Sequence, residues 1–158
     1  MTAPGAKTIW ILRHGEAANT APTDASRALT QAGREQVLRS AVHLMSEPLE
    51  LMLVSPYVRA QQTAQLVYTA LGQRVEMRTA AWLTPDSDPD QVLAELDRAS
   101  VSNLLLVSHQ PLVGMLLGLL DRGDRSSPYS MGTASLAQLE GAAPLPGLMT
   151  LRSLRHSH

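Results

Sequence analysis

Residues 7–12 of this chain read KTIWIL, and Arg13, His14 and Gly15 follow at once. The run is short, apolar and partly β-branched, which is typical of a strand buried on both faces of a sheet. The polar pair Arg13-His14 therefore stands at the carboxyl end of a predicted strand. We therefore expect these two side chains to act at that edge of the sheet.

Strands and helices alternate along most of the chain, as their hydrophobic patterns indicate. Such alternation is typical of an α/β fold, here a three-layer α/β/α sandwich with a mostly parallel central sheet. We expect a single domain over residues 1–158, with 1–6 and about 155–158 flexible. The further strands are expected at 51–54, 74–78, 103–107, 135–139 and 148–154, and the helices at about 30–46, at about 55–71, from Asp88 onward, and after the 108–111 turn to about 120.

Helix starts are marked by their capping residues. Thr30 is a natural N-cap for the first helix. Ser55-Pro56 offers a capping hydroxyl and then a proline at the first helical position, and Asp88-Pro89 repeats the arrangement. These signals predict where three helices begin.

Composition excludes several classes of protein. The chain has no cysteine, which rules out disulfides, thiolate zinc sites and a cysteine nucleophile. A formal net charge of −1 gives no electrostatic reason to expect nucleic acid or an anionic membrane as partner. The first seven residues lack the apolar segment of a secretory signal, and the longest apolar run, 112–120, is too short to cross a bilayer. We therefore expect a soluble cytoplasmic protein.

Polar side chains follow three of the predicted strands. Arg13 and His14 follow the first, Ser55 and Arg59 the second, and His109 the fourth. In a parallel sheet these ends share one edge, where ligands bind and where helix N-termini offer free amides to an anion. The guanidinium group of arginine binds phosphate oxygens through two parallel hydrogen bonds, so we expect a phosphate group as the ligand.

These motifs, taken in order, resemble the histidine phosphatase superfamily, also called phosphoglycerate-mutase-like. Within it the chain is most similar to SixA-type phosphohistidine phosphatases. The resemblance covers residues 9 to about 139, and the last twenty or so residues match nothing diagnostic. The segments that carry it are RHG (13–15), RALTQAG (27–33), SPYVRAQQTA (55–64), LTP (83–85), LLVSHQPLVG (105–114) and GTAS (132–135).

The resemblance implies a mechanism with a phosphorylated enzyme. His14 attacks phosphorus and is transiently phosphorylated, and water then releases phosphate. For attack, one ring nitrogen must be unprotonated while the other is held as a donor, for example by a backbone carbonyl. Arg13 and Arg59 would bind the phosphoryl oxygens, and His109 would also contact that group. No cofactor or metal is expected, because side chains supply the positive charge.

Further site residues follow from the same resemblance. Arg27 matches a basic position of SixA-like members, and Gln110 and Gly15 are also expected at the substrate. Many relatives protonate the leaving group with a carboxylate after the third strand, but the position aligned with it here is Trp82.

The remaining candidates for the general acid are Glu16 and Asp86, since Asp88 is committed to capping. A phosphoramidate departs more readily than an alkoxide. The absence of the usual acid therefore favours phosphohistidine over an alkyl phosphate ester as substrate.

The partner is expected to be a phosphorylated protein or a small phosphorylated substrate. Larger relatives insert a helical lid between the second and third strand regions, and this chain is too short there to hold one. An open site of this kind favours a phosphohistidine on a folded protein. Two alternatives stay open: a small-molecule phosphoesterase of the same fold, and a catalytically idle module that binds a phosphorylated ligand.

Overall fold

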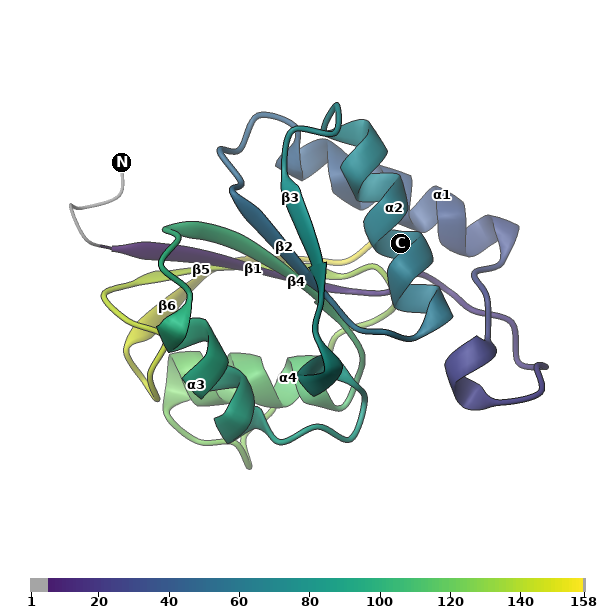
Figure 1. Cartoon of the computed structure of the whole chain (residues 1–158). Coiled ribbons are helices and arrows are strands. Elements are labelled where there is room, and N and C mark those ends of the chain that lie inside the picture. Colours follow the sequence, from purple (N-terminus) through teal and green to yellow (C-terminus); the bar gives the residue numbers. More distant parts are fainter. Residues whose placement is uncertain (1–5, 158) are drawn as a thin grey trace.

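A single sheet runs through the computed structural model, which describes residues 6–157 (Figure 1). The sheet order is β3-β2-β4-β1-β5-β6. The first four strands in this order are parallel, whereas β5 is antiparallel to both of its neighbours. The strands are β1 (Lys7–Arg13), β2 (Leu51–Val54), β3 (Glu76–Thr79), β4 (Asn103–Ser108), β5 (Leu136–Gly141) and β6 (Met149–Arg155).

Helices cover both faces of the sheet. Alternate residues of β1 point to opposite faces: Trp10 and Leu12 pack in one core with α1 and α2, and Ile9 and Ile11 in a second core with α3 and α4. The predicted three-layer α/β/α sandwich with a mostly parallel sheet is therefore confirmed. The helices are α1 (Gln31–Ala41), α2 (Val58–Ala70), α3 (Pro89–Arg98) and α4 (Leu112–Leu117), and a π-helical turn, Gly118–Arg122, extends α4.

The position of β4 brings the three polar strand ends together. β4 lies between β1 and β2 and is parallel to both. In this register Arg13 pairs with Ser108, and Val54 pairs with Val107. The residues that follow the three strands therefore emerge side by side at one edge of the sheet, at a point where the strand order reverses.

Two of the three predicted helix caps are confirmed. The Thr30 side chain accepts a hydrogen bond from the Gly33 amide, and Asp88 accepts one from the Asp90 amide. The third prediction was wrong, because α2 begins only at Val58 and Ser55 does not cap it. A buried histidine holds the Ser55 hydroxyl instead, as described below.

The end of the first helix and the residues before the carboxyl terminus differ from the expectation. The helix expected to continue to about residue 46 ends at Ala41, and a 3₁₀ turn, Val42–Leu44, follows it. Near the carboxyl terminus, the Ser157 hydroxyl donates to the Thr133 carbonyl, and His156 Nδ1 lies 2.8 Å from the buried Ser135 hydroxyl. These two residues thus have partners that the sequence did not indicate. Of the chain ends expected to be flexible, residues 1–5 and 158 lie outside the described residues. No helix between residues 6 and 157 combines the length and the apolar character needed to cross a bilayer.

Two glycines allow the loop after β1 to lie against α1. A Cβ on Gly33 would collide with the Glu16 carbonyl, and a Cβ on Gly15 would collide with the Gly33 carbonyl. The Glu16 carbonyl also accepts a hydrogen bond from the Thr30 amide, next to the start of α1. The backbone that follows His14 is therefore fixed by a contact that no larger residue permits.

We predict that Gly33→Ala lowers the free energy of unfolding by about 1–3 kcal/mol, as overpacking usually does. The sign is informative, because alanine in place of glycine ordinarily stabilises a helix by about 1 kcal/mol. Urea denaturation measures the change. Glu35→Ala, at an exposed position of the same helix, is the control and should change stability by less than about 0.5 kcal/mol. A Gly33→Ala protein as stable as the wild type would contradict the assigned contact.

Candidate active site

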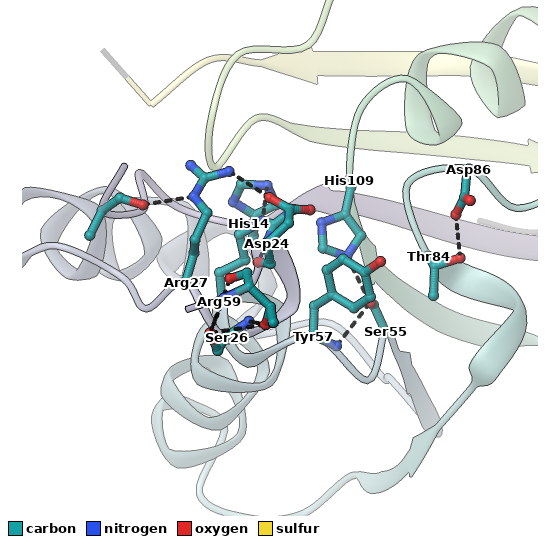
Figure 2. A network of polar contacts seen from close by, with 12 residues as sticks. His14, Asp24, Ser26, Arg27, Ser55, Tyr57, Arg59, Thr84, Asp86 and His109 are labelled. Atoms are coloured by element: carbon teal, nitrogen blue, oxygen red, sulfur yellow. Dashed lines mark hydrogen bonds and ion pairs between the residues drawn. The ribbon is translucent and has the colours of Figure 1, made fainter. Parts of the chain in front are cut away.

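Four of the predicted site residues meet at the carboxyl edge of the sheet, and Figure 2 shows three of them, His14, Arg59 and His109. Arg13 and His14 come from the end of β1, Arg59 from the first turn of α2, and His109 from the residue after β4. The residues His14, Arg59 and His109 are at least 95% buried, with exposures of 5%, 4% and 1%. The sequence-based expectation that these groups converge is met by their positions.

The His14 ring presents one lone pair to the site. Its Nδ1 lies 2.7 Å from the Gly15 carbonyl oxygen, which can only accept, so Nδ1 carries the proton. In the neutral ring Nε2 is then unprotonated, and it accepts a hydrogen bond from Arg59 Nε at 3.3 Å. This is the arrangement of a donor nitrogen and a nucleophilic nitrogen that the predicted mechanism requires.

Electrostatics keep the His14 ring neutral. Burial lowers the pKa of His14 to about 4, against the opposing effect of the hydrogen bond to Gly15, and the charges of Arg13, Arg59 and Arg27 lower it further. At neutral pH the Nε2 lone pair is therefore available. A free imidazole, with a pKa of about 6.5, would be partly protonated near that pH.

The His109 ring is held at its Nε2 by Ser55, a residue that the sequence did not mark as functional. The Ser55 hydroxyl lies 2.7 Å from His109 Nε2 and also accepts a hydrogen bond from the Tyr57 amide. His109 Nδ1 is buried and has no hydrogen-bond partner within the described part of the chain. Burial, then the nearby His14, lowers the pKa of His109 to about 3, so this ring is also neutral. The His14 and His109 ring centroids are 5.1 Å apart.

Two arginines complete the pocket, and each is anchored on one side. Arg13 donates from Nη1 to the Met131 carbonyl, while its Nε is buried without a hydrogen-bond partner among residues 6–157. Arg59 donates to His14 and, from Nη1, to the Asp24 carbonyl oxygen at 2.6 Å. Buried polar groups are nearly always paired. The unpaired Arg13 Nε–H can donate to a bound acceptor, and His109 Nδ1 can do so in the tautomer that carries its proton there.

Asp24 is a member of this cluster that sequence reasoning missed. Its carboxylate lies 3.2 Å from Arg59 Nη2 and 3.0 Å from Arg27 Nη1. Figure 2 draws it in front of His14, with Arg27 on one side and His109 on the other. Asp24 belongs to a 3₁₀ turn, Asp24–Ser26, whose capping box with Thr23 is the one local signal in the sequence. Nothing in that signal indicates that the turn folds over the strand ends.

The other predicted site residues lie around this cluster. Arg27 is linked to it through Asp24, and Gly15 follows the nucleophile directly. Gln110 is turned away, because its side chain accepts from the Gly114 amide and donates to the Tyr129 carbonyl. In the part of the chain that the structure describes, these are its hydrogen bonds, and none leads to the pocket.

The acids considered from sequence have partners elsewhere. The Glu16 carboxylate accepts from the Thr30 hydroxyl at 2.8 Å, and Asp86 accepts from the Thr84 hydroxyl at 3.1 Å. Figure 2 shows Asp86 on the far side of His109 from His14. Trp82 packs against the core on the α3 and α4 side. The described residues contain no group of three or more histidine, aspartate or glutamate side chains arranged to hold a metal ion.

This arrangement suits one kind of reaction. A neutral, buried imidazole has its unprotonated Nε2 beside the Arg59 guanidinium, and the Arg13 guanidinium and the His109 ring belong to the same cluster. Such donors can bind the oxygens of a tetrahedral anion and stabilise the charge they carry as phosphorus is attacked. The geometry therefore fits nucleophilic phosphoryl transfer to His14.

Known proteins share this arrangement of sequence and fold. Residues 9–81 match the family model of the histidine phosphatase superfamily, branch 1. The chain is 36% identical over 143 residues to a phosphohistidine phosphatase SixA homolog of Haemophilus influenzae, covering 83% of this chain and 86% of that protein. It is 34% identical over 136 residues to phosphohistidine phosphatase SixA of Escherichia coli K12, covering 83% of each.

A solved structure agrees with these relatives. The structure of the protein histidine phosphatase SixA complexed with tungstate matches with a TM-score of 0.82 and 30% identity, over 95% of this chain and 97% of that one. Sequence, fold and the RHG residues at the end of β1 thus lead to the same assignment: the chain belongs to the histidine phosphatase superfamily, in the SixA group.

Proposed function

We propose that this phosphatase removes the phosphoryl group from phosphohistidine on a protein, through a phosphorylated His14. The observation that carries the proposal is the unprotonated Nε2 of His14, in a cluster with the Arg59 guanidinium and two buried nitrogens without a hydrogen-bond partner among residues 6–157, Arg13 Nε and His109 Nδ1. Both relatives named above are phosphohistidine phosphatases by name, and the related solved structure holds tungstate, a tetrahedral oxyanion like phosphate.

In the first step His14 Nε2 attacks phosphorus while the bond to the leaving group breaks. Arg13 Nε, Arg59 and His109 Nδ1–H would bind the three transferring oxygens. Ser55 would be a positioning residue in this scheme: with its hydroxyl as the donor to His109 Nε2, 2.7 Å away, the ring proton would be on Nδ1, toward the phosphoryl group. In the second step water attacks phosphorus, the bond from phosphorus to Nε2 breaks, and phosphate leaves.

Phosphohistidine is favoured over small esters by the shape of the site. Only residues 71–75 separate α2 from β3, so no lid is inserted there. An open pocket admits a side chain presented by a folded protein. The position after β3 holds Trp82 in place of the acid that many relatives use, so a proton donor to the leaving group would have to come from another segment. We expect the encounter in the cytoplasm, which suits a chain without cysteine.

A substrate panel tests the proposed function. We expect faster phosphate release from a phosphohistidine protein than from simple alkyl phosphates, because nitrogen leaves phosphorus more easily than an alkoxide does. His14→Ala should abolish release and should also prevent the acid-labile labelling that a radioactive phospho-donor gives the wild type. Circular dichroism of His14→Ala checks that the fold is intact. Faster turnover of alkyl phosphates would favour the small-molecule alternative, and an unlabelled wild type would favour the idle binding module.

Arg59→Ala should lower kcat/KM by about 10²–10³, by analogy with the loss of one preorganised charge-stabilising donor. The reason is that Arg59 contacts the nucleophile directly and carries a buried positive charge. Steady-state kinetics with a phosphohistidine protein measures the effect. Arg98→Ala, on the exposed end of α3, is the matched control and should leave the rate unchanged. Near-normal activity of Arg59→Ala would remove Arg59 from the mechanism.

The protonation of His14 should follow its buried environment. We expect the His14 imidazole of the free enzyme to protonate with a midpoint near pH 4. Because the folded pKa is depressed, the nucleophile is intact throughout the neutral range and is lost only as the pH falls through that midpoint. Histidine NMR titration, with His14→Ala to assign the resonance, measures this value. A midpoint near the ordinary value of about 6.5 would contradict the geometry.

A further inference from the structure

A carboxylate at the mouth of an anion-binding pocket needs an explanation. Asp24 contacts Arg59 in two ways, through its carboxylate and through its backbone carbonyl. Its side chain is 56% exposed, whereas His14 on the pocket floor is 5% exposed. Asp24 thus stands at the rim above the nucleophile. A surface depression lined by Asn19, Pro22, Asp24 and Arg27 continues outward from it.

The direction of attack makes the rim the place where the leaving group departs. Phosphoryl transfer requires the attacking and leaving atoms to lie roughly in line on opposite sides of phosphorus. His14 attacks from the floor, so the leaving atom must face the solvent side. Asp24 occupies that side, and its pairing with Arg59 shows that it reaches the groups that would hold the phosphoryl oxygens.

We propose that Asp24 is the proton donor to the leaving group, and this inference rests on the proposed phosphatase function. In the empty site Asp24 serves as the counter-ion of Arg59 and Arg27. When the phosphoryl group enters, it takes over Arg59 and leaves Asp24 beside a second anion. A carboxylate in that position gains a proton more readily and can hand it on.

The proton and bond changes balance over the two steps. As the bond from His14 Nε2 to phosphorus forms, the bond from phosphorus to the leaving nitrogen or oxygen breaks, and that atom takes the proton of Asp24. Water then attacks phosphorus and gives a proton to the Asp24 carboxylate, while the bond from phosphorus to Nε2 breaks. Asp24 takes up its proton from solvent when the substrate binds, and it releases that proton to solvent when phosphate leaves and it pairs with Arg59 again. The net reaction is hydrolysis, and both His14 and Asp24 return to their starting states.

The charged and titratable groups that face Asp24 explain its two states. They are Arg27 in the same loop, Arg59 on α2, and His109 after β4. In the empty site the hydrogen bond from Arg27, and after it those from Arg59, hold the pKa of Asp24 below its ordinary value. Replacing the Arg59 partner by a phosphoryl dianion acts in the opposite direction, since a like charge favours the neutral acid.

The two acids named from sequence fit this position less well. The Glu16 carboxylate is bound by Thr30 at the start of α1, and Asp86 by Thr84 after β3. The structure gives neither of them a contact with Arg59 or His14 in the chain it describes. Asp24 is the carboxylate that contacts two of the cationic side chains around the pocket.

The test compares leaving groups of different acidity. Wild type and Asp24→Asn are assayed with substituted phenyl phosphates, from phenyl to 2,4-dinitrophenyl, and with a phosphohistidine protein. A proton donor matters most for the least acidic leaving group. We expect Asp24→Asn to slow phenyl phosphate by about 10²-fold and the dinitrophenyl ester by less than about threefold. If Asp24 must be protonated to act, kcat of the wild type should fall as the pH rises, and Asp24→Asn should lose that fall. Asp97→Asn, at an exposed site on α3, is the control and should match the wild type.

Several results would overturn this role. If Asp24→Asn slows all esters equally, or binds inorganic phosphate more tightly and turns over every ester faster, Asp24 is a counter-ion alone. If Glu16→Gln or Asp86→Asn shows the steeper dependence on the leaving group while Asp24→Asn does not, the proton comes from that residue. A wild-type protein that hydrolyses neither the esters nor phosphohistidine would overturn the proposed function as well. Thermal unfolding of each variant separates these outcomes from a loss of fold.

Discussion

The parallel pairing of β4 with both β1 and β2 is the constraint on which the site depends. In the sheet β4 lies between β1 and β2, although α1, α2, α3 and β3 come before it in the sequence. Because the register sets Arg13 beside Ser108, the residue after each strand lies next to the other. A shift of one residue would turn each buried side chain to the opposite face and would separate His14 from His109.

The positive charge of the buried Arg59 guanidinium at this strand edge needs a negative charge nearby. Burying a guanidinium is costly unless it is paired, and Arg59 is almost fully buried. The two histidines add no charge to this cluster, because burial keeps both rings neutral. In the structure Asp24 supplies the negative charge, and in the proposed reaction the phosphoryl group replaces it. The same carboxylate therefore stabilises the empty site and is set free when the site is filled.

Much of the fold could be predicted because its signals are local. The apolar run at 7–12 and the caps at Thr30 and Asp88 depend on residues within one turn or strand, and the structure agrees with them. Ser55 shows where this kind of reasoning fails. Its sequence is that of a helix cap, but its hydroxyl bonds to a histidine 54 positions later, and only the strand order brings the two together.

Asp24 could not have been found from sequence for a related reason. Its neighbours, Thr23 and Ser26, form a capping box that describes an ordinary turn. What gives the turn its place is a set of long-range contacts: Arg59 binds the backbone and the carboxylate of Asp24, and Arg27 binds the carboxylate and the Ala18 carbonyl. Both arginines would have to be known as pocket residues before the turn could be assigned to the pocket.

The short connection after α2 also bears on where a proton donor can come from. In the segment after β3, Trp82 packs against the core, and the Asp86 carboxylate accepts a hydrogen bond from the Thr84 hydroxyl on the far side of His109 from His14. The loop between β1 and α1 lies on the other side of His14 from the segment after β3, and it is long enough to fold over the nucleophile. A domain without a lid has few segments that reach the solvent side of a bound phosphoryl group. The turn that carries Asp24 does reach it, which is why the acid of this site should be sought before α1 and not after β3.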